Sequence, residues 1–266
     1  MCGARVVTSA TLAAAVGRYV EAVPPETVRR HVRRTWVYRL PDRQVGPIAV
    51  VPDGCIDLRW IAGRLSVDGP HRSAVAETLA PDALVVGLRF QPGAAPRWLG
   101  LPASEITDRC IALEDIWGSN ARQLTEWAGE ARTPLGIARR LEAAVSRRSS
   151  AFNPTDGEMR RVFALLEGAT HAPVPDVATM AARLGLGLGE RTLRRRCHEA
   201  FGYGPKTLGR ILRFQRFLRL AYHGEGAVAL ARCAGEAGYA DQAHLSREAQ
   251  RLSGLSPRTI AAQLAR

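Results

Sequence analysis

The sequence predicts an α+β protein of two domains. Short β-branched and aromatic runs, separated by Gly and Pro turns, fill residues 34–93, so the N-terminal domain is expected to be a small β-barrel or sandwich, degenerate cupin-like, with appended helices. Apolar residues recur at helical spacing after residue 157, which predicts an all-α C-terminal domain. A polar stretch, RRSSAFNPTD, lies between them. The expected parts are a tail over 1–27, the β-rich domain over 28–148, a linker over 149–157 and the helical domain over 158–266.

The chain is strongly basic. Its 266 residues carry a formal net charge of +12, and the sequence pI is near 10.6. Such a charge favours a polyanionic partner, with nucleic acid first and an anionic membrane surface second. From Thr155 to Arg266 there are 17 Lys and Arg against 10 Asp and Glu, so the surplus is denser in the helical part. The hydrophobic fraction of 46% is that of a globular protein.

The cysteines and the hydropathy favour a reduced, cytoplasmic protein without a membrane segment. The five cysteines are odd in number and lie far apart, and no pair has metal-ligand or redox spacing, so neither a disulfide framework nor a zinc ribbon is expected. The Ala-rich run at 11–16 is too short and too weakly apolar for a signal peptide. No stretch approaches the length of a membrane span. We expect no cofactor and no bound metal.

Within the β-rich domain, strands are expected in 35–40, 46–54, 55–63, 64–70 and 83–93. Residues 101–118 are expected to be rich in loops, and 119–145 to form two helices around Pro134. Strand alternation puts Cys55, Asp57 and Arg59 on one face and Ile56, Leu58 and Trp60 on the other. If the polar face lines a pocket, its arginines suit an anionic ligand and its aromatic residues a planar one. The alternative is a polar face that is simply exposed to solvent.

The candidate effector pocket consists of Cys55, Asp57, Arg59, Trp60 and Arg89. A metal-binding cupin needs two or three His and a Glu on neighbouring strands, and this half of the chain has only His31 and His71. We therefore expect no catalytic residue there. An alternative uses Cys55 as a reactive thiol for alkyl transfer in DNA repair, although the four-Cys zinc cluster of such proteins is absent.

The helical domain contains the same pattern twice. Helices are expected over 177–184 and 190–201, separated by a turn with three glycines, and again over 228–238 and 241–252. A helix over 205–222, about 27 Å long, joins the two pairs. A short helix, a turn and a basic helix is the arrangement that places a recognition helix in a DNA major groove. A helical hairpin with a solvated basic face is the alternative for either unit.

The residues GYADQAHLSREAQRLSGLSPRTI resemble the signature of AraC/XylS-type transcription regulators, and the resemblance runs from Glu158 to the C-terminus. It implies two recognition helices that enter successive major grooves on one face of DNA. The matching positions are Gly238, Tyr239, Leu245, Ser246, Arg247, Gly254, Ser256 and Pro257. The N-terminal runs VPDGCIDLRW and VVGLRFQPGAAPRWLGLPASEITDR resemble an uncharacterised β-rich domain common in actinobacterial regulators, which implies a sensory or dimerising role.

The chain departs from the family pattern in two ways. The run RLGLGLGERTL is two residues longer than the usual turn of the first unit, which could shift the first recognition helix. Ala249 and Cys197 stand where the family has a larger, aromatic residue, so packing beneath both recognition helices is expected to be looser.

The resemblance assigns DNA contacts by position. The residues expected to face the groove are Arg191, Thr192, Arg194 and Arg195 in the first unit, and Gln242, Ala243, Ser246 and Arg247 in the second. Those expected to contact phosphates are Arg196, Lys206, Thr207 and Arg210. Two of these positions have an alternative role. Arg247 either faces the groove, braces the helix or contacts a phosphate. His244 either is half-buried or contacts a base.

Together these features predict a sequence-specific DNA-binding transcription regulator that responds to a small-molecule effector through its N-terminal domain. A homodimer is expected, through the β-rich domain or residues 119–145, and a contact with RNA polymerase if the protein is an activator. The alternatives from other classes are the alkyl-transfer repair protein that uses Cys55 and an architectural protein that binds DNA without sequence preference.

Overall fold

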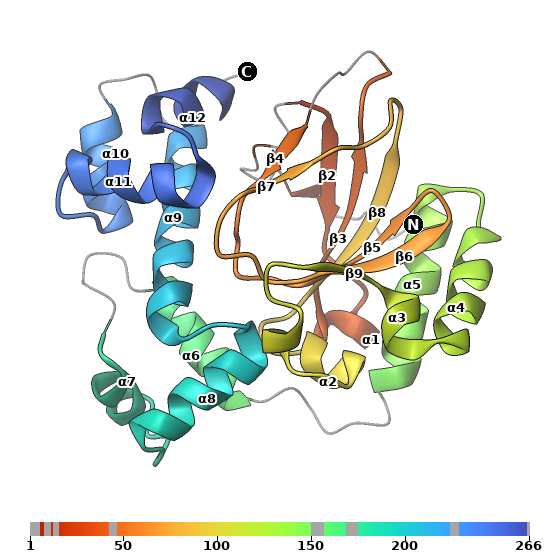
Figure 1. Ribbon diagram of the computed structural model, residues 1–266, viewed down its shortest axis with the longest axis horizontal. Helices are drawn as coiled ribbons and strands as arrows, with labels where there is room; N and C mark the ends of the chain where they lie inside the picture. The colour runs from red at the N-terminus through yellow and green to blue at the C-terminus, as the bar shows by residue number, and fades with distance from the viewer. Residues whose placement is uncertain are drawn as a thin grey trace.

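A computed structural model describes residues 6–7, 12, 16–42, 47–149, 157–168, 175–223 and 229–264. It has a β-rich N-terminal part and a helical C-terminal part, which lie side by side in Figure 1. The predicted α+β class is confirmed. No helix in the described part of the chain is long and apolar enough to cross a membrane.

The N-terminal part is built on two antiparallel sheets. The larger has seven strands in the order β1-β2-β3-β8-β5-β6-β9, and the smaller pairs β4 with β7. The strands of the larger sheet are β1 (Val6–Val7), β2 (Arg18–Ala22), β3 (Val32–Arg39), β8 (Leu84–Phe90), β5 (Asp57–Ile61), β6 (Arg64–Asp68) and β9 (Cys110–Ala112). Those of the smaller are β4 (Ile48–Val50) and β7 (Val75–Glu77).

Strand alternation gives the large sheet two different faces. One face buries Leu58, Val86 and Leu88 in a core that it shares with the helices. The opposite face carries a small aromatic core around Trp36 and Tyr38, which also includes Ile48 of β4. The helices of this part are α1 (Glu26–Arg29), α2 (Ala95–Leu99), α3 (Leu113–Trp117), α4 (Ser119–Gly129) and α5 (Pro134–Ser149).

Gly87 of β8 lies opposite Trp36 of β3, and the indole of Trp36 occupies the space that a side chain at 87 would need. A Cβ there would come within 2.1 Å of the indole. We therefore expect Gly87→Ala to displace Trp36 and to lower the free energy of unfolding by about 1–3 kcal/mol, as overpacking does. Urea denaturation of the two proteins measures this difference. Gly129→Ala is the control, because a Cβ at the end of α4 meets open space and the φ of Gly129 is not positive.

Several predictions for the N-terminal part need correction. The expected tail over 1–27 contains β2, which pairs along its whole length with β3 and so belongs to the sheet. Residues 101–118 hold a short 3-10 helix (Ala103–Glu105), β9 and α3 rather than loops alone. The two helices around Pro134 are confirmed as α4 and α5. Within the expected linker, residues 150–156 lie outside the described part.

The C-terminal part contains two helix-turn-helix units, one at each end of a long helix, as Figure 1 shows. Its helices are α6 (Gly157–Gly168), α7 (Val177–Arg183), α8 (Glu190–Phe201), α9 (Pro205–His223), α10 (Ala229–Ala237), α11 (Gln242–Ser253) and α12 (Pro257–Leu264). One hydrophobic core runs through all of them, with Phe214 and Phe217 of α9 fully buried. The predicted long helix with apolar residues on several sides is confirmed.

The two parts contact each other at the end of α8, at α11 and near the middle of α9. The hydroxyl of Thr107 donates to the carbonyl of Gly202 at 3.1 Å, and the backbone N–H of Ala74 donates to the carbonyl of Leu252 at 2.7 Å. Near the middle of α9, the side-chain amide of Gln215 donates to the carbonyl of Pro52 at 2.7 Å. Both helix-turn-helix units are therefore docked on the N-terminal part.

Candidate functional site

The helices α8 and α11 have the same local design. Each begins at an extended N-cap residue, Gly189 for α8 and Asp241 for α11. Each buries an apolar residue at its fourth position, Leu193 or Leu245, and a small one four residues later, Cys197 or Ala249. Each ends at a glycine with φ of 81° or 71°. This left-handed conformation is one that residues with a Cβ rarely adopt. A proline then starts the following helix.

The turn of the first unit is longer than that of the second. Residues 184–189 separate α7 from α8, whereas residues 238–241 separate α10 from α11. The first turn is thus two residues longer than the second, and its length relative to the usual turn of the family stays a prediction. Leu186, in this longer turn, is buried in the hydrophobic core, so the insertion is anchored by packing.

The exposed side of α8 carries three arginines. Arg194 pairs with Glu190 at 3.2 Å, and Arg195 pairs with Glu199 at 2.7 Å. These i,i+4 pairs are exposed on both sides, so they stabilise the helix little and a phosphate or base can replace the carboxylate. Arg191 is exposed and makes no hydrogen bond or ion pair with the described residues. Thr192 lies beside it and is half-buried.

The corresponding side of α11 exposes Gln242, Ala243 and Arg247. The hydroxyl of Ser246 donates to the carbonyl of Gln242 at 2.8 Å. His244 is half-buried: its ring meets that of Tyr239 edge-on at 5.2 Å, and its Nδ1 accepts from the backbone N–H of Ala240 at 3.5 Å. These contacts give His244 a role in holding the turn before α11.

The residues expected to contact phosphates fall into two groups. Lys206 is exposed in the first turn of α9, with the half-buried Thr207 next to it. Arg210 instead forms two hydrogen bonds to Glu248, at 2.7 and 2.8 Å, with both side chains largely buried, and so joins α9 to α11. Arg196 pairs with Glu158 and joins α8 to α6. Arg196 and Arg210 thus brace pairs of helices, and their contact with phosphates stays a prediction.

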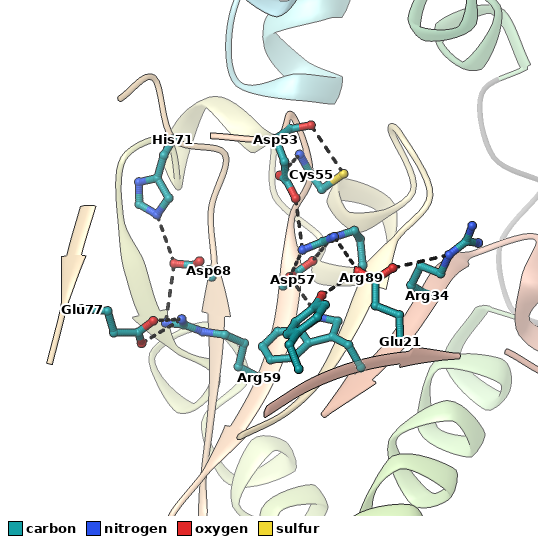
Figure 2. Close-up of polar contacts among 12 residues, drawn as sticks. Glu21, Arg34, Asp53, Cys55, Asp57, Arg59, Asp68, His71, Glu77 and Arg89 are labelled. Atoms are coloured by element: carbon teal, nitrogen blue, oxygen red, sulfur yellow. Dashed lines mark hydrogen bonds and ion pairs between the residues drawn. The ribbon is translucent and has the colours of Figure 1, made fainter. Parts of the chain in front are cut away.

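In the N-terminal part, charged side chains gather between the two sheets (Figure 2). The guanidinium of Arg89 contacts Asp57 at 3.1 Å, Asp53 at 3.1 Å and Glu21 at 3.2 Å. The indole N–H of Trp36 donates to the same Asp57 carboxylate at 3.1 Å. Glu21 also contacts Arg34 at 3.7 Å, so two guanidinium groups face three carboxylates and the acids remain in excess by one.

A second group adjoins the first. Arg59 contacts Glu77 at 2.8 Å and Asp68 at 3.6 Å, and also donates to the sulfur of Cys110 at 3.2 Å. Asp68 is in turn 3.1 Å from Nε2 of His71. Figure 2 shows this chain from His71 through Asp68 and Arg59 to Glu77. Both arginines of the predicted pocket are therefore already paired with carboxylates.

Two adjoining cavities, each of about 80 Å³, lie at these groups. The first, here named the barrel cavity, lies between the sheets and is lined by Tyr19, Trp36, Tyr38, Arg59 and Glu77, among others. The second, the interface cavity, is lined by Pro52, Asp53, Cys55, His71 and, from α9, Gln215. Asp57, Asp68, Arg89 and Val50 line both.

The predicted pocket is thus assembled in most of its members. Of the five residues, Cys55, Asp57, Arg59 and Arg89 line these cavities. Trp60 lines neither and packs against the core on the helical face of the sheet, as strand alternation requires. Arg59 and Arg89 already pair with carboxylates, so the geometry does not favour the anionic ligand that the sequence suggested. Sequence reasoning missed Glu21, Asp53, Asp68 and Glu77; Asp53 was visible only as part of a Pro-Asp-Gly turn.

Burial controls the titration of this site. It raises the pKa of the Cys55 thiol far above its usual range, so the reactive thiolate is disfavoured and the alkyl-transfer alternative loses support. Burial is also the main cause that raises the pKa of Asp57 to about 6. The positive charge of Arg89 lowers this pKa, and the negative charge of Asp53 raises it further. Among the described residues, no group of three or more His, Cys, Asp or Glu side chains is placed to hold a metal ion.

His71 should give the protein a pH-dependent contribution to stability. The hydrogen bond to Asp68 is the main cause that raises the pKa of His71. Desolvation lowers this pKa, and the negative charge of Asp108 raises it. The proton is therefore held more tightly in the folded state, and its stabilisation is full below about pH 6.5, the unfolded value, and is lost as the pH rises through the raised value. We expect wild type to exceed His71→Gln in stability by a larger margin at low pH than at high pH. Thermal denaturation of both proteins across this range measures that margin, and a constant margin would contradict the assignment.

Two family models match separate parts of the chain. A model described as a helix-turn-helix domain matches residues 180–263, and a model described as a domain of unknown function (DUF6597) matches residues 20–112. A search of curated proteins found no match.

Solved structures of ToxT from Vibrio cholerae are similar at low identity. ToxT of strain O395 is 13% identical, with 86% of this chain and 96% of that chain covered and a TM-score of 0.48. The P21 form of ToxT at 1.65 Å is 14% identical, covers 87% and 98%, and has a TM-score of 0.49. The structure of ToxT from strain SCE256 bound to an unsaturated fatty acid is 13% identical, covers 86% and 94%, and has a TM-score of 0.49. These values are too low to transfer a site or a ligand to this chain.

Proposed function

We propose, from the premise that the chain is a DNA-binding transcription regulator of the AraC type, that α8 and α11 read two segments of one operator. The observation that carries the proposal is the repeated design of these helices, each with a buried apolar side and an exposed polar side, at the two ends of α9. The 19 residues of α9 span about 28 Å, close to the rise of one turn of DNA.

The two helices present different chemistry to the groove. On α8 the proposed contacts are Arg191, Thr192, Arg194 and Arg195, and a guanidinium can bind guanine through two hydrogen bonds. On α11 they are Gln242, Ala243, Ser246 and Arg247, where an amide can bind adenine. Lys206 and Thr207 are the proposed phosphate contacts at the start of α9.

A loop couples the cavities to the DNA-reading part. Asp53 pairs with Arg89 at 3.1 Å, while the neighbouring carbonyl of Pro52 accepts from Gln215 of α9. Gly54, with φ +79°, packs so closely that a Cβ would lie 3.1 Å from Leu208 of α9. An effector that changes the partners of Arg89 therefore acts on residues in contact with α9. This is the proposed route by which a small molecule alters the placement of α8 and α11.

The proposal includes further partners and a location. The protein acts in the cytoplasm as a homodimer, and as an activator it would contact RNA polymerase. Sedimentation of the purified protein tests the dimer separately from DNA binding.

Selection of random DNA fragments by the purified full-length protein tests the function. The proposal predicts a recovered motif of two half-sites about one helical turn apart. Binding should survive excess competitor DNA and weaken as salt rises, because phosphate contacts release counterions. Recovery of fragments without a shared motif, with binding that competitor DNA removes, would instead favour an architectural DNA-binding protein.

A further inference from the structure

The two adjoining cavities carry more acidic than basic groups. Five carboxylates surround them, from Glu21, Asp53, Asp57, Asp68 and Glu77, and three guanidinium groups and one imidazole oppose these, from Arg34, Arg59, Arg89 and His71. Each guanidinium is already in contact with at least one carboxylate. Since the cations are engaged and the acids remain in excess, the cavities favour a further positive charge.

The titration of Asp57 agrees with this charge balance. Burial is the largest cause of its raised pKa, and the carboxylates of Asp53 and Asp68 raise it further, while Arg89 opposes them.

The barrel cavity also has aromatic walls. Tyr19, Trp36 and Tyr38 line it, and the rings of Tyr19 and Trp36 lie 5.7 Å apart with a 31° tilt. Aromatic faces next to carboxylates are the environment in which proteins hold alkylated ammonium ions, because the ring quadrupole attracts a cation that water solvates weakly.

Two residues that line the barrel cavity carry polar atoms that lack a partner among the described residues. The hydroxyl of Tyr38 and Nε of Arg59 are buried and make no hydrogen bond within the described part of the chain. Their side chains are almost fully buried, at 4% and 7% exposure. Since buried polar groups are normally satisfied, these atoms point to a guest that accepts hydrogen bonds as well as carrying charge.

We propose that the barrel cavity binds a small organic cation, an alkylated ammonium that also bears a hydroxyl or carbonyl oxygen, as the effector of this regulator. The inference rests on the proposed function and specifies its ligand class. The ammonium group lies among the aromatic rings and the carboxylates of Asp68 and Glu77. The oxygen accepts from the buried donors. The barrel cavity and the adjoining interface cavity are about 80 Å³ each, and together they are close to the volume of about 150 Å³ that holds benzene, so the ligand has few heavy atoms.

Calorimetric titration of the full-length protein tests the charge of the ligand directly. The probes are choline, its neutral carbon isostere neohexyl alcohol, and the anion of tert-butylacetic acid, which share a branched head of the same size. Trimethylammonium is the smaller cationic probe. We expect saturable binding of a cationic probe, tighter than that of the alcohol by about tenfold or more. Equal binding of the alcohol, tighter binding of the anion, or no saturable binding of either cation at millimolar concentration would overturn the proposal.

A charge-neutral substitution locates the site. Glu77→Gln keeps the shape of a partly exposed cavity residue and removes one carboxylate. The affinity for the cation should therefore fall by about tenfold, and the affinity for the alcohol should not change. Asp82→Asn is the matched control, because Asp82 pairs with Arg39 on the surface and lines neither cavity. An equal loss in both variants, or none in Glu77→Gln, would count against this cavity.

Operator binding separates this proposal from the one on which it rests. If the anion, and not choline, binds and shifts operator affinity, effector-responsive regulation stands and the cationic class is wrong. If the protein binds no operator with or without any probe, the regulator proposal fails, whatever the calorimetry shows. A cation that binds and changes operator affinity supports both.

Discussion

Replacement of Arg89 by Met is expected to lower the free energy of unfolding by about 3 kcal/mol. The substitution leaves Asp53, Asp57 and Glu21 without their shared guanidinium, and an unpaired buried carboxylate costs about 3–5 kcal/mol. We expect a loss at the lower end of this range because the Arg89 side chain is 20% exposed to solvent. Urea denaturation, followed by circular dichroism, measures the loss.

The matched control is Arg39→Met. Arg39 also lies in the large sheet and forms two hydrogen bonds to a carboxylate, that of Asp82, but this pair is exposed. Because water screens exposed pairs, the control should change stability little. A loss in Arg89→Met as small as that of the control would show that the charged groups between the sheets do not depend on Arg89.

Replacement of Arg191 or Arg247 by Ala is expected to weaken operator binding by about 1–3 kcal/mol each, or about tenfold to a hundredfold, if each makes a base contact. Both side chains are exposed, and neither has a partner among the described residues, so stability should stay unchanged. The two losses should fall on different half-sites, since the residues lie on α8 and α11. Binding of operators mutated in one half-site at a time measures this.

Arg122→Ala is the control for a simple loss of positive charge. Arg122 is exposed on α4, in the N-terminal part, and pairs there with Glu114. It should leave operator affinity unchanged at moderate salt. Equal losses for Arg191→Ala on both half-sites, and on unrelated DNA, would assign Arg191 to phosphate contact rather than to base recognition.

Much of the fold could be predicted because it depends on local patterns. The strands β3, β5, β6 and β8 are bounded by Gly and Pro turns, and the helices α8 to α11 show clear apolar periodicity. The strand β2 was missed because its sequence, RYVEA, is short and its pairing partner β3 follows a helix and two prolines. Its place in the sheet is decided by tertiary contacts.

The cavity residues show a different limit. Alternation correctly put Asp57 and Arg59 on one face, but the partners Glu21 and Glu77 come from β2 and β7, whose positions depend on the topology of both sheets. Without those carboxylates the arginines suggested an anionic ligand. In the same way, Arg210 could be placed near DNA by position, while its pairing with Glu248 across two helices could not be foreseen.

In the proposed complex α8 and α11, held apart by α9, bind one face of the same DNA at once. The decisive measurement is the affinity for an operator in which about five base pairs, half a helical turn, are inserted between the two half-sites. We expect this operator to bind no better than one with a single half-site, because α9 fixes the separation of the two helices. Undiminished affinity for the operator with the insertion would show that α8 and α11 do not bind both half-sites at once.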